Sequence, residues 1–214
     1  MATPLAPSFT VDTLLTAADN ALRALFVPAR TDRSLPELPE ASPLAETDRR
    51  HVAGLMRVNH AGEIAAQALY QGQALMARSA ATREYLLRSA GEEGDHLGWC
   101  EQRLKELDAR TSVLNPFWYA GSFAIGAIAA ALSDAWSLGF LTETERQVEG
   151  HLNAHLEQLP ADDHRSRRIL ETMRSDEIRH AKAADARGAA ELPRWARAGM
   201  KLTSKLMTRL AYWI

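Results

Sequence analysis

The sequence predicts an all-α fold, in which four long helices form a bundle and an amphipathic helix is added at each end. Two observations carry this prediction. Long stretches free of proline repeat their apolar residues at helical spacing, and no segment alternates apolar and polar residues as a half-buried strand does. With 46% hydrophobic and 24% charged residues, the 214-residue chain can bury the core of one such domain.

The N-terminal region, residues 1–47, contains one predicted helix and a proline-rich linker. The linker VPARTDRSLPELPEASP contains four prolines, so we expect it to be extended. Because Asp12 and Asp19 interrupt the apolar positions and no basic segment precedes them, we expect no secretory signal. The predicted helix spans residues 10–26, with apolar positions Val11, Leu14, Leu15, Ala18, Leu22 and Leu25.

The central region, residues 48–190, is predicted to form the bundle itself. Its helical stretches are joined by short turns, which place consecutive helices antiparallel to one another. Asn115–Pro116 begins the third helix, and Pro160 ends it. The predicted helices span residues 48–78, 82–109, 115–159 and 162–190.

A run of 23 uncharged residues, TSVLNPFWYAGSFAIGAIAAALS, lies between Arg110 and Asp134. Its length alone is that of a membrane span, but its proline, glycines and many alanines favour close packing between helices. We expect the apolar end of this helix to line a tunnel into the bundle and to touch a membrane surface. A purely buried helix is the alternative, and a true span is the least favoured interpretation.

The C-terminal region, residues 191–214, is predicted to form a basic amphipathic helix that contacts a membrane. No acidic residue follows Glu191, and tryptophans stand near both ends. Such a helix is suited to lie in an anionic membrane interface. The alternative is a helix docked on the bundle. The bases are Arg194, Arg197, Lys201, Lys205 and Arg209, and the apolar stripe is Leu202, Leu206, Leu210 and Trp213.

Charge and cysteine content exclude some classes of function. The net charge of −2 gives no electrostatic reason to expect a nucleic-acid partner. The single cysteine, Cys100, cannot form a disulfide within the chain and is interpreted as a small core residue in a reducing compartment.

Two Glu-x-x-His pairs, in GEEGDH and SDEIRH, are the strongest functional signal. They place Glu93 beside His96 and Glu177 beside His180. Residues three apart share one face of a helix, and a carboxylate with an imidazole suits iron, manganese or zinc. A single pair of this kind is more often a solvated helix face.

In an antiparallel hairpin, two residues that are equally far in sequence from the turn lie at the same level. By this rule each Glu-x-x-His pair faces one single glutamate on the neighbouring predicted helix. Glu63 lies level with the first pair and Glu149 with the second, although this argument does not separate Glu149 from Glu145, one turn earlier. Four buried carboxylates would repel one another unless cations neutralise them. Four carboxylates and two imidazoles are the ligand set of ferritin-like di-iron and di-manganese proteins, so the predicted bundle is ferritin-like.

Five stretches resemble the demethoxyubiquinone hydroxylase family of di-iron monooxygenases in ubiquinone biosynthesis. The resemblance covers roughly residues 48–188 and is most specific at NHAGE and DEIRH. It favours Glu149 over Glu145. The stretches are RVNHAGEIAAQALYQGQ, EEGDHL, NPFWYAGSFAIGA, VEGHLNAHL and SDEIRHAKAA. The ligands that the resemblance implies are Glu63, Glu93, His96, Glu149, Glu177 and His180.

The resemblance also implies cofactors, partners and a location. Two iron ions per chain and O₂ would hydroxylate a demethoxy polyprenyl quinol, although the ligands also suit manganese. Electrons would come from an external donor or from the quinol, and a lipid-binding accessory protein would deliver the substrate. The chain would lie peripherally on the cytoplasmic face of the bacterial inner membrane. A ferritin-like iron-oxidising or iron-handling protein is the alternative.

Two further residues are candidates for supporting the metal ligands. His155 lies near Glu149 in sequence and would gate protons or contact a ligand; an ordinary surface histidine is the competing interpretation. Tyr70, two turns beyond Glu63, would line the pocket or simply fill the core.

Overall fold

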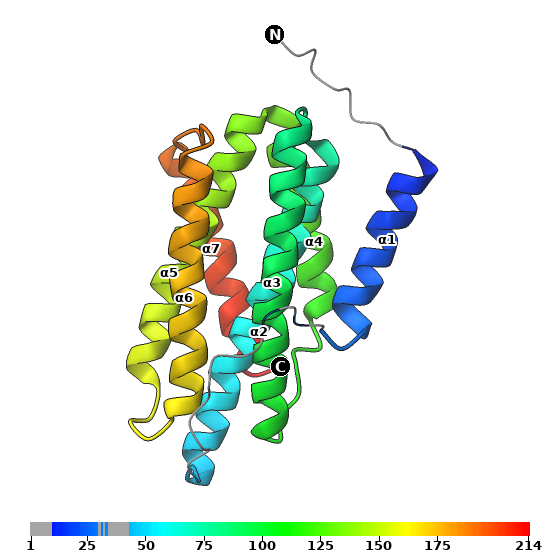
Figure 1. Cartoon of the computed structure of the whole chain (residues 1–214). Coiled ribbons are helices and arrows are strands. Elements are labelled where there is room, and N and C mark those ends of the chain that lie inside the picture. The colour runs from blue at the N-terminus through cyan, green and yellow to red at the C-terminus, as the bar shows by residue number, and fades with distance from the viewer. Residues whose placement is uncertain (1–9, 30, 32, 34–42) are drawn as a thin grey trace.

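The computed structural model describes residues 10–29, 31, 33 and 43–214, and these residues form seven helices and no strand (Figure 1). The all-α prediction is therefore confirmed. Pro36 and Pro39 of the predicted linker lie outside the described residues. The helices are α1 (Val11–Phe26), α2 (Glu46–Met76), α3 (Ala80–Glu106), α4 (Asn115–Leu132), α5 (Asp134–Gln158), α6 (His164–Asp185) and α7 (Arg194–Ala211).

Two antiparallel hairpins, α2–α3 and α5–α6, make up the bundle (Figure 1). Each turn is fixed by a capping side chain. Ser79 accepts a hydrogen bond from the backbone N–H of Thr82, and Asp163 accepts one from that of Ser166. The last bundle helix ends five residues earlier than predicted, at Asp185, and Gly188 follows with a φ of +89° that favours glycine. Both turns fall at the segments predicted to hold them, ARSAAT (residues 77–82) and PADDH (residues 160–164).

The prediction of one helix over residues 115–159 is wrong, because the chain breaks at Ser133. Ser133 has extended backbone and its side chain accepts a hydrogen bond from the Trp136 N–H, so it begins a new helix. The Asp134 carboxylate also accepts hydrogen bonds from the backbone N–H groups of Arg78 and Ser79, tying this corner to the first hairpin. Consequently α4 is a crossover that runs along α2, and α3 and α5 point the same way (Figure 1).

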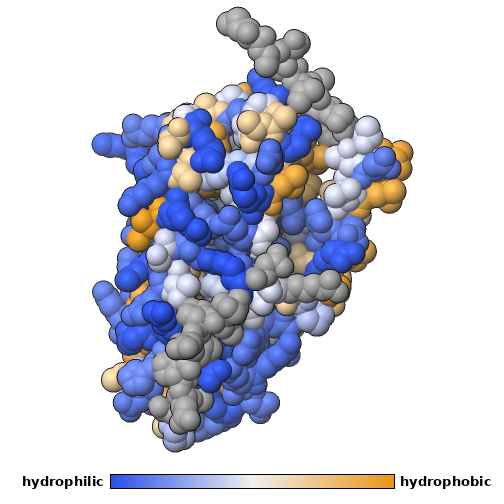
Figure 2. Space-filling view, in the orientation of Figure 1, coloured by the Kyte–Doolittle hydropathy of each residue, from blue (hydrophilic) through white to orange (hydrophobic). Residues whose placement is uncertain are grey.

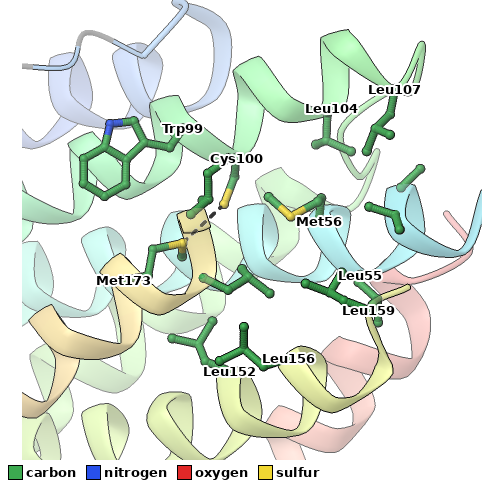
Figure 3. Packing of buried hydrophobic residues seen from close by; sticks show 14 residues of the cluster. Leu55, Met56, Trp99, Cys100, Leu104, Leu107, Leu152, Leu156, Leu159 and Met173 are labelled. Carbon is green, nitrogen blue, oxygen red and sulfur yellow. Dashed lines mark hydrogen bonds between the residues drawn. The ribbon is translucent and has the colours of Figure 1, made fainter. Parts of the chain in front are cut away.

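The apolar core has two main parts, which lie on either side of a polar layer. One part draws side chains from all four bundle helices, including Met56, Trp99, Leu152 and Met173 (Figure 3). Cys100 is buried there with its sulfur 3.9 Å from that of Met173, which confirms its interpretation as a core residue. The other part includes Tyr70, Leu86, Leu141 and Ala184.

Helix α4 packs against the backbone of α2 through glycines. A Cβ atom at Gly126 would lie 2.1 Å from the carbonyl oxygen of Leu69, and one at Gly72 would lie 2.1 Å from that of Phe123. Small residues therefore allow the close approach that the composition predicted. Among the described helices, none is long and apolar enough to cross a membrane.

The end helices dock on the bundle but keep apolar faces exposed. Helix α7 lies along α2 and α5, burying Ala196 and Ala211, and Tyr212 covers Gly54. Figure 2 shows hydrophobic residues on the outer side of α1, in contrast to the hydrophilic surface over α3 and α6. The exposed apolar residues are Val11, Leu14, Leu15, Leu22 and Phe26 in α1, and Trp195, Leu202, Leu206 and Trp213 at α7.

Candidate metal centre

Four glutamates and two histidines from α2, α3, α5 and α6 meet between the two parts of the core. All six are buried, and they form two groups whose ligand atoms lie within 4.8 Å of one another. Glu93 and Glu177 belong to both groups, so these two carboxylates could contribute to holding two ions. The first group is Glu63, Glu93, His96 and Glu177, and the second is Glu93, Glu145, Glu177 and His180.

The structure corrects one predicted ligand: Glu145 is in the cluster and Glu149 is not. The turn between α5 and α6 is centred on residue 161, so Glu145 and Glu177 both lie sixteen residues from its centre. In the first hairpin, centred on residue 78, Glu63 and Glu93 both lie fifteen residues away. In each hairpin, the two glutamates of the cluster therefore lie at the same level. Glu149 is half-buried and lies about one helical turn nearer to the loop between α5 and α6, so it is not level with Glu177.

Both histidines present Nδ1 to the cluster. His96 Nδ1 lies 3.0 Å from Glu93 Oε2 and 3.2 Å from Glu177 Oε1. His180 Nδ1 lies 3.2 Å from Glu93 Oε1. The Nδ1 atom of each histidine therefore lies close to a carboxylate of the opposite hairpin, His96 to Glu177 and His180 to Glu93.

The outer nitrogen of each imidazole contacts a carboxylate from the opposite hairpin. His96 Nε2 lies 3.1 Å from Asp176 Oδ2, and His180 Nε2 lies 2.7 Å from Glu92 Oε2. Asp176 directly precedes Glu177 as Glu92 directly precedes Glu93, so the two halves repeat this contact. An outer carboxylate of this kind fixes the orientation of a metal-binding imidazole.

Several buried inner atoms of the cluster have no hydrogen-bond partner among the residues that the structure describes. They are both carboxylate oxygens of Glu93 and of Glu177 and the Nδ1 atoms of His96 and His180. Buried polar atoms are costly unless they are paired or coordinate a metal. Oxygen and imidazole ligands in this arrangement suit divalent transition metals, so the residues present fit a metal centre.

Burial and the charges of neighbouring residues raise the pKa of some residues in the cluster and lower the pKa of others. Burial raises the pKa of Glu63 to about 8 and, with the charge of Glu177, raises the pKa of Glu145 well above its usual value. Burial also acts to raise the pKa of Glu93, but the two histidines outweigh it and lower that pKa. Despite burial, the carboxylates raise the pKa of His180 to about 12 and that of His96 well above its usual value. The raised pKa values favour the protonated forms of Glu63, Glu145, His96 and His180, whose protons offset the negative charge of the buried carboxylates.

Comparison with known proteins identifies the family. The sequence matches the model of the family described as ubiquinone biosynthesis protein COQ7 over residues 50–211. The chain belongs to this family. It is 57% identical over 203 residues to the 3-demethoxyubiquinol 3-hydroxylase of Dechloromonas aromatica (strain RCB), covering 94% of this chain and 98% of the relative. It is 56% identical over 196 residues to the protein of the same name from Azoarcus sp. (strain BH72), covering 91% and 95%.

The COQ7 match confirms the predicted resemblance and extends it. The motifs that carried the resemblance ended near residue 188, whereas the matched region continues to the end of α7. The C-terminal helix is therefore part of what this chain shares with the family.

Tyr70 contacts the cluster directly. Its hydroxyl donates a hydrogen bond of 2.5 Å to Glu145 Oε1, and its ring is fully buried in the core. Tyr70 thus fills the core and also supports a carboxylate of the cluster. It is not among the residues that line the cavity described below, so the structure does not give it the predicted pocket-lining role.

His155 lies away from the cluster. It is ten residues beyond Glu145 on α5, about 15 Å along the helix axis. Its ring centroid lies 3.9 Å from that of His151, and burial lowers its pKa to about 3. The structure therefore contradicts direct contact between His155 and a cluster carboxylate, and it also contradicts the exposed-surface interpretation.

A mainly apolar cavity of about 570 Å³ leads from the surface to the cluster. It lies between α2, α4, α5 and α7, and Glu63 of the cluster is among the residues that line it. The sequence predicted a tunnel lined by α4, but it gave no sign that α7 forms another wall. Wall residues from the four helices include Leu69, Trp118, Ile125, Phe140, Met200 and Met207.

Proposed function

We propose that this chain binds two iron ions and uses O₂ to hydroxylate the ring of a demethoxy polyprenyl benzoquinol, as a 3-demethoxyubiquinol 3-hydroxylase of ubiquinone biosynthesis. The observation that carries the proposal is a buried Glu/His cluster at the inner end of an apolar cavity. The names of the relatives and the COQ7 family support the same activity. Two ferrous ions, when bound, would supply the electrons with which O₂ is reduced.

The positions of the carboxylates support a division of roles among the ligands. Glu93 and Glu177 belong to both groups and would bridge the two ions. Glu63 with His96 would complete one metal position, and Glu145 with His180 would complete the other. Four carboxylates balance the charge of two divalent cations while the imidazoles bind as neutral ligands.

The cavity would hold the substrate ring. Its apolar walls exclude water, and Glu63 at its inner end would bring the ring close to the metal centre. Asn59, Thr144 and Gln147 are among the polar residues of a mainly apolar lining and would orient the ring oxygens. The polyprenyl tail would leave through the mouth between α4 and α7.

Exposed apolar residues at this mouth support membrane contact. On α4, Phe117, Ile128 and Leu132 line the cavity and are more than half exposed, as is Trp195 in α7. The five bases of the C-terminal region would attract anionic lipids. We therefore place the chain peripherally on the cytoplasmic face of the bacterial inner membrane, where an external electron donor and a lipid-binding accessory protein would meet it.

The alternative, an iron-oxidising or iron-handling protein, would use the same cluster. Iron ions are hydrophilic, so iron handling does not require an apolar cavity of this size with apolar residues around its mouth. The cavity therefore favours the hydroxylase.

The test is turnover of a short-tailed demethoxyubiquinol by iron-loaded protein with ¹⁸O₂ and a chemical reductant. We expect a hydroxylated quinol that contains one labelled oxygen, and we expect none from Glu177→Ala. Gly121→Phe, which adds bulk to the cavity wall where a side chain meets no atom within 4 Å, should raise KM at unchanged iron content. Iron-loaded protein that oxidises iron but leaves the quinol unchanged would contradict the proposal.

A further inference from the structure

A short N-terminal strap, defined here as Ala29, Thr31 and Arg33, crosses α3 beside the metal centre. The Ala29 N–H donates a hydrogen bond of 3.1 Å to Glu101 Oε2. The Thr31 methyl group occupies the place of a side chain at Gly98, where a Cβ atom would lie 2.4 Å from it. The glycine thus allows the strap to approach the helix that carries Glu93 and His96.

Arg33 joins the strap to both α3 and α6. Its Nε lies 3.0 Å from Asp95 Oδ2, and its Nη2 lies 2.6 Å from Asp176 Oδ2. The guanidinium carbon lies 5.0 Å from the centroid of the Trp99 ring. A planar guanidinium held by two carboxylates and an aromatic ring has a well-defined orientation.

The oxygen that Arg33 binds is the one that contacts His96. Asp176 Oδ2 lies 2.6 Å from Arg33 Nη2 and 3.1 Å from His96 Nε2. A continuous chain of contacts therefore runs from the strap to an imidazole of the candidate metal centre. Arg33 lies outside the region matched by the COQ7 family model.

The other half of the centre has a weaker counterpart. Glu92, which contacts His180, has a 37% exposed side chain, against 11% for Asp176. The nearest arginine nitrogen to Glu92, Arg179 Nη2, lies 3.4 Å away on a side chain that is 52% exposed. The two histidines are thus held by contacts of similar type but unequal burial.

We propose that Arg33 is a positioning residue that fixes Asp176 and, through it, the His96 imidazole with Nδ1 directed at the cluster. This inference rests on the proposed metal centre. It makes the two metal positions unequal, because the position completed by Glu63 and His96 is tied to the N-terminal strap. Outer partners of metal ligands contribute about 10- to 100-fold in metal affinity.

The test is an anaerobic titration of the full-length apoprotein with Fe(II), using Arg33→Ala. Arg23→Ala is the control, since the Arg23 side chain forms an exposed ion pair with Asp19 within α1 and with no other residue in the described part of the chain. We expect wild type and the control to bind two ions, and Arg33→Ala to bind one of the two about 10- to 100-fold more weakly. One of the two ferrous Mössbauer doublets should shift in Arg33→Ala. In the Asp176→Asn background, adding Arg33→Ala should have little further effect.

The outcomes separate the inference from the proposed function. Failure of wild type to bind two ions would overturn the proposed function and this inference with it. Two ions in wild type and unchanged affinity and spectrum in Arg33→Ala would overturn the inference alone. An equal loss at both positions together with a lower unfolding midpoint would also overturn it, because the strap would then be a general stabiliser.

Discussion

Glu145 and Glu149 stand one turn apart on α5, and the difference between them decides the ligand set. Four residues advance about 6 Å along a helix, which is enough to move a carboxylate out of reach of the same ion. Tyr70 adds a second distinction, because it donates a hydrogen bond to Glu145. Each ligand is thus selected by its level in the bundle and by the neighbour that holds it.

Replacing each of these glutamates with glutamine separates their roles. We expect Glu145→Gln to reduce the iron content from about two to about one per chain, because it removes a charged ligand of the His180 position. Glu149→Gln should keep both ions. Metal analysis of the purified, iron-loaded variants measures this difference, and the reverse pattern would restore Glu149 as the ligand.

Metal binding should displace the protons that the cluster holds. At pH 7 Glu63 and His180 hold protons, because their pKa values are about 8 and about 12, and the raised pKa values of Glu145 and His96 favour their protonated forms. Binding of two Fe(II) ions should therefore release about two protons or more. Because ligation requires the deprotonated forms, metal affinity should rise with pH. Calorimetric titration in two buffers of different ionisation enthalpy gives the proton count. Release of fewer than about two protons would contradict these protonation states.

At the scale of helices, the sequence predicted most elements because their signals are local. Ser79 and Asp163 lie in turns whose position follows from the end of each apolar pattern. The break at Ser133 was missed because the apolar pattern continues across it. A serine followed by an aspartate was the available signal, but what fixes the corner is the contact of Asp134 with the turn at residues 78–79, a partner far away in sequence.

The close contact between α2 and α4 predicts the effect of added methyl groups. Gly126→Ala would force a Cβ against the Leu69 carbonyl and should destabilise the fold by about 1–3 kcal/mol. Gly121→Ala, on the exposed side of the same helix, meets no atom within 4 Å and should stabilise it by up to about 1 kcal/mol. Urea unfolding measures both. Equal stability of the two variants would show that α4 does not pack tightly on α2.

At the scale of the whole molecule, the candidate site depends on contacts that no local pattern reveals. Five of the six cluster residues were predicted, because both Glu-x-x-His pairs and Glu63 follow from helical geometry and two short turns. The cavity wall from α7 and the strap contact of Arg33 join segments far apart in sequence. Their position depends on how the end regions dock on the bundle, which residue spacing does not encode.

Membrane contact through α7 predicts selective binding to vesicles. Wild type should float with vesicles that contain phosphatidylglycerol, less so at high salt. Replacing Leu202 and Leu206 with glutamate should weaken binding by more than about tenfold, since a buried leucine contributes about 1.5–3 kcal/mol. Leu87→Glu, an exposed leucine on α3, is the matched control and should bind as wild type does. Equal flotation of all three proteins would place the membrane contact elsewhere.

The central claim is that the six buried residues hold two iron ions between the halves of the bundle. A Mössbauer spectrum of protein loaded with the Mössbauer isotope of iron, beside iron analysis of the same sample, tests it most directly. We predict about two irons per chain that are magnetically coupled, with the coupling lost in Glu177→Ala because Glu177 belongs to both groups. A folded protein that binds no coupled iron would contradict the account.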